Sequence, residues 1–202
     1  MEIPPTPLWP LSLVGGLVTA AIAVYVWTRR QVPGAYVLFA AMVAIAELCI
    51  TAALEERSPT LAGQIFWLRV QIVGYAFVPV FWFLLTLSYV GHPLPGRRAA
   101  ALYVIPAITI LLHWTNAWHH LYWSRVWIDR TGPITIMGRV YGPGLWTFMG
   151  YTYVLMAAGV FMLLRYLPRG RVQRRRTFAF LVAMALPLAA NVLYMYEWFP
   201  VR

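Results

Sequence analysis

Long apolar stretches alternate with short polar connections along the whole chain. Most of them are long enough to cross a hydrocarbon core of about 30 Å as a helix that rises about 1.5 Å per residue. The fourth is shorter and contains Pro106, which is expected to kink it. This pattern predicts an all-α integral membrane protein, a six-transmembrane-helix bundle that forms a single domain over residues 1–202. The predicted helices are 8–27, 35–54, 61–90, 99–113, 145–164 and 177–196.

Charged residues divide between the two ends of the predicted bundle. The connections after the first, third and fifth segments contain arginines and no acid, so the positive-inside rule places them in the cytoplasm. The acids outside the segments fall on the opposite side, which predicts an inner-membrane protein with its N-terminus outside. The arginines after the fifth segment are expected to anchor it to lipid headgroups. They are Arg165, Arg169, Arg171, Arg174, Arg175 and Arg176, and the earlier connections contribute Arg29, Arg30, Arg97 and Arg98.

Composition narrows the functional classes. Because 61% of the residues are hydrophobic and only 11% are charged, a soluble domain is excluded. The net charge of +10 does not indicate nucleic acid, since most arginines lie beside apolar segments where membrane lipids are the nearer partner. A retinal Schiff base is excluded because the chain has no lysine. No pattern of histidines, acids or nucleophiles indicates an enzyme, a metal site or a cofactor.

Two ionisable residues lie inside predicted helices, at matching depths on neighbouring segments. Glu47 comes seven residues before the end of the second segment, and Arg69 comes eight residues after the start of the third. A lone charge near the bilayer centre costs about 2.5–3.5 kcal/mol on insertion scales, so an intramembrane ion pair is predicted between them. Two interpretations stay open, a clamp between helices and the polar floor of an outward-facing cavity.

The longest connection, residues 114–144, is rich in tryptophan, tyrosine and histidine and lies on the predicted outer side. Residues 131–136 are expected to pair as a short hairpin. A connection of this length is usually functional or disordered, and this one is too aromatic for disorder. It is interpreted either as part of a binding site or as an aromatic belt at the membrane interface.

Motifs over nearly the whole chain resemble one family. The most specific are WTNAWHHLYW at residues 114–123 and FWLRVQIVGY at 66–75. The chain resembles the N-terminal seven-helix sensor region of histidine kinases. Further matching stretches are Arg30 with VPGA at 32–35, ALE at 53–55, PVFWF at 79–83, LSYVG at 87–91, IP at 105–106, GYTY at 150–153 and NVLY at 191–194.

The resemblance implies a sensor that reads an outer signal and transmits it by helix movement. Aromatic walls with a few polar groups are typical of a site for a small amphipathic ligand. A homodimer or a larger membrane complex is the expected assembly, with membrane lipids around it. The expected ligand-binding residues are Glu47, Trp67, Arg69, Gln71, Trp114, Asn116, His119, Trp123, Trp146 and Asn191.

The chain departs from the family pattern at its end, because the sequence stops where a seventh helix is expected to begin. It is therefore expected to be either a piece of a longer receptor or a stand-alone relative, and any kinase activity would lie in a further C-terminal domain. A structural subunit, or a ligand- or pigment-binding subunit, of a larger membrane complex is the alternative function.

Overall fold

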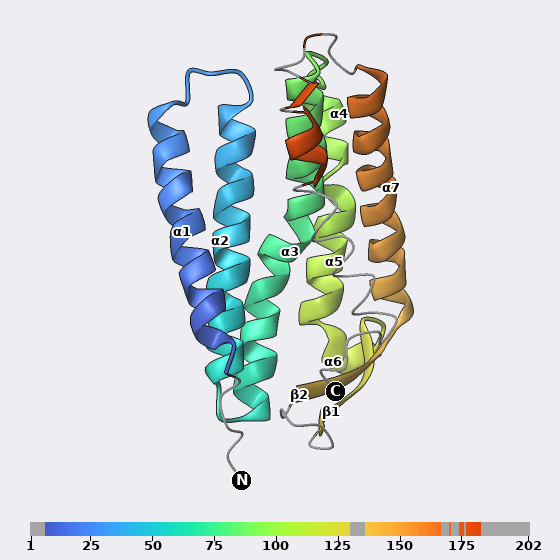
Figure 1. Ribbon diagram of the computed structural model, residues 1–202. Coiled ribbons are helices and arrows are strands. Elements are labelled where there is room, and N and C mark those ends of the chain that lie inside the picture. The colour runs from blue at the N-terminus through green and yellow to red at the C-terminus, as the bar shows by residue number, and fades with distance from the viewer. Residues whose placement is uncertain (1–6, 130–135, 167–169, 171–173, 176, 183–202) are drawn as a thin grey trace.

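The computed structural model describes residues 7–129, 136–166, 170, 174–175 and 177–182. Its helices run side by side as one layered bundle, with α1 and α2 paired on one side of a central α3 (Figure 1). Helices α4, α5 and α7 lie on the other side of α3, and a two-stranded hairpin caps one end.

Four helices of the described residues are long and apolar enough to cross a membrane. Their bounds lie close to those expected from the sequence, which confirms a mostly helical protein built on membrane-length segments. They are α1 (Trp9–Thr28), α2 (Ala35–Arg57), α3 (Leu61–Tyr89) and α7 (Pro143–Arg165).

Local signals explain where these helices start. Gly34 precedes α2 with a φ of 83°, a left-handed conformation that glycine adopts without a steric penalty. The Thr60 hydroxyl accepts a hydrogen bond from the Gly63 N–H at 3.1 Å and so caps the first turn of α3. Pro143 occupies the first turn of α7, where its missing N–H leaves no hydrogen bond unmade.

The fourth predicted segment is not one continuous helix. It forms α4 (Gly96–Ala101) and α5 (Val104–Trp114), with a turn at residues 102–103. Pro106 cannot donate a backbone hydrogen bond to Leu102, the residue four positions earlier. The hydroxyl of Tyr151 on α7 donates to the Leu102 carbonyl instead. The expected kink is thus a break one turn before the proline, and a neighbouring helix supplies the missing donor.

Of the sixth predicted helix, only residues 177–182 are described, and they are helical. They pack against the end of α3, where the hydroxyls of Tyr89 and Thr177 lie 3.0 Å apart. The ring of Phe180 stacks on Trp82 with centroids 6.4 Å apart. The remainder of the predicted helix, 183–196, lies outside the described residues, so the number of crossings stays a prediction.

A hairpin is present, but its strands are formed almost entirely by residues outside the stretch 131–136 in which a hairpin was expected, and it makes the all-α description incomplete. Strand β1 (Trp123–Asp129) pairs antiparallel with β2 (Ile136–Tyr141), and Trp123 is opposite Tyr141. The strands lie on either side of residues 130–135, which are outside the described part of the chain.

The arginine-bearing connections gather at one end of the bundle. The connections after α1 and α3 and the end of α7 lie together, opposite the hairpin and the start of α1 (Figure 1). Arg165, Arg174 and Arg175 are exposed there, as are the arginine pairs that end α1 and begin α4. Arg169, Arg171 and Arg176 lie outside the described residues.

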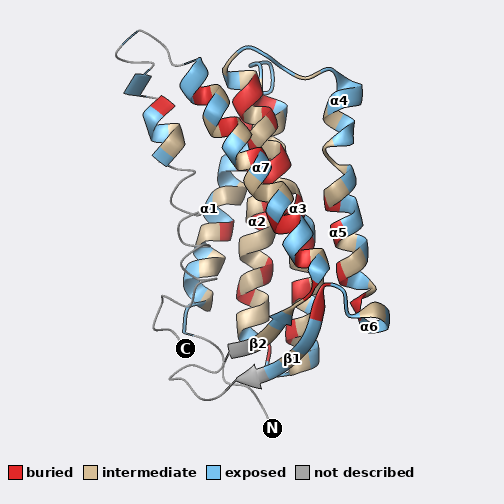
Figure 2. Ribbon diagram, turned by 90° about the vertical axis from the view of Figure 1, so that its right-hand side faces the viewer, coloured by how far each residue is buried: buried red, intermediate tan, exposed pale blue. Residues whose placement is uncertain are grey.

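Helix α3 is the most buried of the four membrane-length helices, whereas α1 exposes most of its surface (Figure 2). The main core lies where α3 meets the hairpin, α5 and α7. Its buried members are Leu68, Ile72, Ala76, Tyr122, Trp123, Leu145, Phe148 and Met149.

Glycines set the closest approaches between helices. A Cβ at Gly74 of α3 would fall against the Glu47 carboxylate and the Ala44 carbonyl oxygen of α2. A Cβ at Gly159 of α7 would fall against the Trp82 ring of α3. At Gly150 of α7, by contrast, an added Cβ would meet no atom within 4 Å. The helix spacing around α3 therefore depends on two particular missing side chains.

We expect Gly74→Ala to lower the unfolding free energy by about 1–3 kcal/mol, the usual cost of overpacking, because the Ala44 carbonyl is backbone and cannot rotate away. Gly150→Ala is the matched control and should be neutral or slightly stabilising, since alanine is the better helix former. Thermal unfolding in detergent measures both. Equal melting temperatures for the two variants would contradict the close α2–α3 contact.

Candidate functional site

The site begins with the turn that follows α5, where Asn116 opens the short helix α6 (Asn116–His119). Its buried side-chain oxygen accepts hydrogen bonds from the N–H groups of Tyr122 and Trp123, at 2.8 and 3.0 Å. Its amide nitrogen donates to the Trp123 carbonyl at 3.0 Å. His120 ends the helix in a left-handed conformation with a φ of 54°. Asn116 therefore fixes how the chain enters the hairpin.

His119 closes the same turn. Its Nδ1 accepts a hydrogen bond from the Leu121 N–H, and its Nε2 lies 3.0 Å from the Thr115 hydroxyl. Thr115 in turn donates to the Leu111 carbonyl. Both ring nitrogens are thus engaged within the turn, and His119 is not among the residues that line the two cavities described below.

The hairpin has one face toward the helices and one toward solvent. Trp127 and Val140 are 41% and 47% exposed, whereas Trp123 is buried and Val126 packs on the core. A bulge between Trp123 and Arg125 shifts the register of β1. Through this irregularity the hairpin directs Trp123, with Arg139 and Tyr141 of β2, to the helices.

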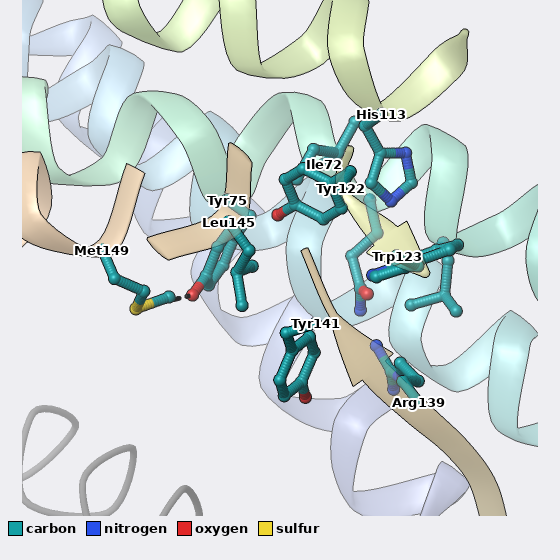
Figure 3. A pocket seen from close by; sticks show the side chains of 11 residues that line it. Ile72, Tyr75, His113, Tyr122, Trp123, Arg139, Tyr141, Leu145 and Met149 are labelled. Atoms are coloured by element: carbon teal, nitrogen blue, oxygen red, sulfur yellow. Dashed lines mark hydrogen bonds between the residues drawn. The ribbon is translucent and has the colours of Figure 1, made fainter. Parts of the chain in front are cut away.

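A cavity of about 190 Å³ lies between this inner face and α3, α5 and α7. Met149 and Tyr75 lie at one end and His113 and Trp123 at the other, with Arg139 across from the helices (Figure 3). The walls are mainly apolar and aromatic, with a few polar groups between them. The full lining is Leu68, Gln71, Ile72, Tyr75, His113, Tyr122, Trp123, Arg139, Tyr141, Leu145 and Met149.

His113 is the centre of this region. Its ring packs edge-on against Tyr122 and Trp123, with centroids 4.7 and 4.4 Å away. Burial raises the pKa of the Tyr122 phenol far above its usual range, so that group stays neutral. Arg69 and Arg139 both lie close enough to His113 to interact with it electrostatically.

A second cavity of about 230 Å³ adjoins the first across His113 and Trp123, which line both. Polar and basic groups are more prominent here. The lining is Ile65, Arg69, His113, Asn116, Ala117, His120, Trp123, Ser124, Arg125 and Val126.

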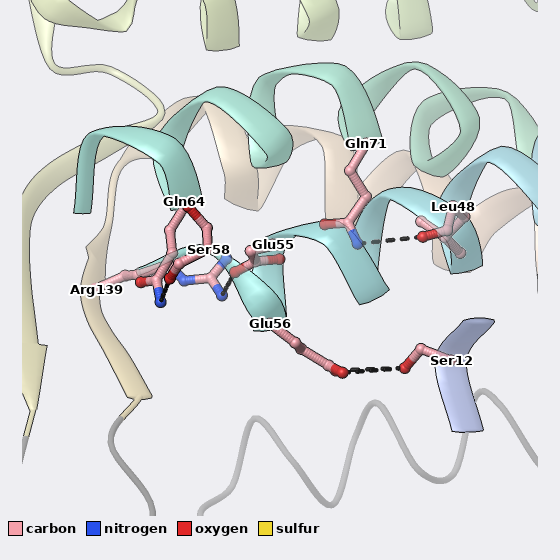
Figure 4. Close-up of polar contacts among 8 residues, drawn as sticks. All are labelled: Ser12, Leu48, Glu55, Glu56, Ser58, Gln64, Gln71 and Arg139. Atoms are coloured by element: carbon pink, nitrogen blue, oxygen red, sulfur yellow. Dashed lines mark hydrogen bonds and ion pairs between the residues drawn. The ribbon is translucent and has the colours of Figure 1, made fainter. Parts of the chain in front are cut away.

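Polar contacts at the end of α2 join this helix to the hairpin and to α1, and another joins the start of α3 to the residue that follows α2 (Figure 4). One nitrogen of the Arg139 guanidinium, Nη2, lies 4.0 Å from a carboxylate oxygen of Glu55. The Gln64 amide donates to the Ser58 carbonyl at 3.4 Å, and the Ser12 hydroxyl of α1 donates to Glu56 at 3.3 Å. The cavity wall is therefore connected through Glu55 to the α1–α2 pair.

The predicted site residues separate into those at the cavities and those away from them. Arg69, Gln71, Asn116 and Trp123 line one or both cavities. Trp67 packs against the Phe66 ring, and Trp114 and Trp146 are 46% and 56% exposed, which is typical of aromatic residues at a membrane interface. Asn191 lies outside the described residues.

The predicted ion pair between Glu47 and Arg69 is not formed. A carboxylate oxygen of Glu47 instead accepts a hydrogen bond from the Gly74 backbone N–H at 2.9 Å. Glu47 lines an apolar groove between α2 and α3, while Arg69 lines the second cavity. Matching depth was insufficient, because Arg69 and Gly74 are five residues apart and so lie on different faces of α3.

Sequence reasoning missed several lining residues, chiefly His113, Tyr75, Tyr122, Arg139 and Tyr141. His113 lies in the last turn of α5, and its side chain is only 2% exposed. The alternation of Arg139 and Tyr141 along one strand was the available signal, but it requires the strand and its register to be known. In the described part of the chain, no three His, Cys, Asp or Glu side chains gather to hold a metal.

Comparison of the sequence with models of known protein families gave a match to one family. The model described as the N-terminal 7TM region of histidine kinase matches residues 11–202. Comparisons with curated proteins and with solved structures gave no match.

We expect Asn116→Ala to lower the unfolding free energy by about 2 kcal/mol or more, because it leaves two buried N–H groups and one carbonyl without partners. Asn116→Asp keeps the oxygen that accepts these hydrogen bonds, so its unfolding free energy should fall by less. Trp118→Ala is the control on the same short helix, since Trp118 is 85% exposed. Thermal unfolding in detergent distinguishes them, and an equal effect of Asn116→Ala and Trp118→Ala would show that Asn116 does not hold the hairpin.

Proposed function

Because the chain belongs to the family of N-terminal 7TM regions of histidine kinases, a membrane sensor region and not the catalytic part, we propose that it binds a small amphipathic ligand in the hairpin cavity. Binding shifts the balance between two helix arrangements, and helix movement transmits the signal to the arginine-bearing end. A ligand can do this only through different affinities for the two arrangements.

The single observation that carries the proposal is the position of the cavity. It is bounded by a hairpin at one end of the bundle, by α3 and α7, which continue to the other end, and by the shorter α5. Aromatic and apolar walls with convergent polar groups are the usual form of a small-molecule site. The cavity adjoins the core where α3, α5, α7 and the hairpin meet, so its occupancy would act on all four elements at once.

Helix α3 is the best candidate for transmission. It contributes Leu68, Gln71, Ile72 and Tyr75 to the cavity and runs for 29 residues to the opposite end. There Trp82 packs on Gly159 of α7 and on Phe180, and Tyr89 contacts Thr177. A shift of α3 at the cavity would therefore change the packing of the segment that starts at Thr177.

We further propose that the hairpin faces outward and that the arginine-bearing end is cytoplasmic, within the inner membrane. The exposed arginines at that end support this orientation through the positive-inside rule. Membrane lipids are the proposed partners of the exposed apolar surface of α1 and of the exposed arginines.

Orientation is tested with single cysteines in a Cys49→Ala background. Trp118→Cys, on the hairpin side, should react with a membrane-impermeant maleimide in intact cells. Arg98→Cys, exposed at the opposite end, should react only after the membrane is permeabilised. The reverse pattern would overturn the proposed orientation.

Transmission is tested by filling the cavity. Ile72→Phe adds volume at a buried lining position, whereas Val73→Phe adds the same ring at the next residue, which is 39% exposed. With spin labels at Val90 and Arg165, Ile72→Phe should shift the distance distribution by about 1–2 Å, the scale of a helix shift. Val73→Phe should leave it unchanged. Identical distributions for both variants would contradict transmission through α3.

A further inference from the structure

The hairpin cavity contains two buried polar atoms that lack hydrogen-bond partners. They are Nε of Arg139 on β2 and Nδ1 of His113 on α5, and both residues line the same space. A guanidinium Nε always carries a proton, and His113 Nδ1 donates when it carries the ring proton. Buried polar groups are normally satisfied, so two orphans on one cavity indicate a missing acceptor.

The charges around the cavity point to the sign of that acceptor. No acid lines either cavity in the described residues, whereas Arg139 lines the first and Arg69 and Arg125 line the second. Glu55 is the acid nearest to the Arg139 guanidinium among the described ion pairs, and it reaches only Nη2, at 4.0 Å. The Arg139 charge is therefore only partly compensated, and its buried Nε has no hydrogen-bond partner.

The remaining walls define the rest of the ligand. Ile72, Leu145 and Met149 offer apolar surface, and the Trp123 ring lies under the Arg139 guanidinium at 5.9 Å. A volume of about 190 Å³ admits only a compact molecule. A planar carboxylate matches the fork of a guanidinium, and a small apolar body matches the walls.

We propose that the ligand of this cavity is a small carboxylate anion with a compact apolar or aromatic body. Its carboxylate accepts hydrogen bonds from Arg139 Nε and from His113 Nδ1. This inference rests on the proposed function, since it names the chemical class of ligand for the same site.

Glu55 gives the site a built-in competitor. A carboxylate bound at Arg139 Nε shares one positive charge with Glu55 at Nη2, and the two negative charges repel each other, so binding weakens the contact between the hairpin and the end of α2. Glu56 of that end also contacts Ser12 of α1. Ligand binding thus releases the hairpin from the α1–α2 pair, a second way in which the cavity acts on the bundle.

The test uses the full chain in nanodiscs of zwitterionic lipid, which supply no anionic headgroups to compete. Calorimetric titration with benzoate is compared with benzyl alcohol, which has a similar shape and no charge. Hexanoate has the same carboxylate on an aliphatic chain and distinguishes a lipid-derived acid from an aromatic solute. We expect benzoate or hexanoate to bind at least tenfold more tightly than benzyl alcohol.

Two variants should change the affinity for the acid in opposite directions. Arg139→Gln should weaken binding about tenfold or more, because the charge-assisted hydrogen bond is lost. Glu55→Gln should tighten it by about threefold, because the competitor is neutralised. Arg57→Gln is the control, since Arg57 is exposed two residues from Glu55 and contacts the Trp9 ring instead. If the Glu55–Arg139 pair only stabilised the fold, the two substitutions would change the affinity for the acid in the same direction.

The outcomes separate this inference from the proposed function. If benzyl alcohol binds as tightly as the acids and Ile72→Phe abolishes its binding, the cavity is a ligand site but the carboxylate assignment is wrong. If Glu55→Gln weakens acid binding as Arg139→Gln does, the competition is overturned. If no probe binds and Ile72→Phe also fails to shift the spin-label distances, both the inference and the proposed function are refuted.

Discussion

In the hydrocarbon core of a membrane, every backbone N–H and carbonyl must find its partner within the protein, and the whole structure follows from this requirement. Continuous helices satisfy it along α1, α2, α3 and α7. Where Pro106 interrupts the ladder, the Tyr151 hydroxyl reaches the freed Leu102 carbonyl from α7. The hairpin, whose backbone is not helical, caps one end of the bundle (Figure 1). The cavity lies at that end because irregular backbone can be placed there.

Polar side chains inside α2 and α3 find their hydrogen-bond partners on the backbone of the neighbouring helix. Glu47 accepts from the Gly74 N–H, and the Gln71 amide donates to the Leu48 carbonyl, both across the α2–α3 contact. Gly74 allows this close approach, since a side chain there would displace the carboxylate. The two helices are therefore joined through backbone contacts, without the ion pair that the sequence suggested.

Besides its packing on the core, the hairpin is held by specific polar contacts at two places. Asn116 fixes its first residues, and Glu55 contacts Arg139 on its second strand. Between these two attachments lie the His113, Tyr122 and Trp123 rings. A ligand in the cavity would meet both the rigid attachment and the weaker one, so the weaker Glu55 contact is the one that binding changes first.

Sequence alone determined the membrane class, the approximate bounds of four long helices and the family. These follow from hydrophobic length, proline and glycine positions and motifs, all of which are local properties of the chain. Tertiary structure decided which residues meet. Arg69, Gln71, Asn116 and Trp123, which the sequence singled out, line the cavities together with His113 and Arg139, which it did not. Helix rotation and strand register place a side chain on one face or another, and both are set by packing between distant segments rather than by local sequence.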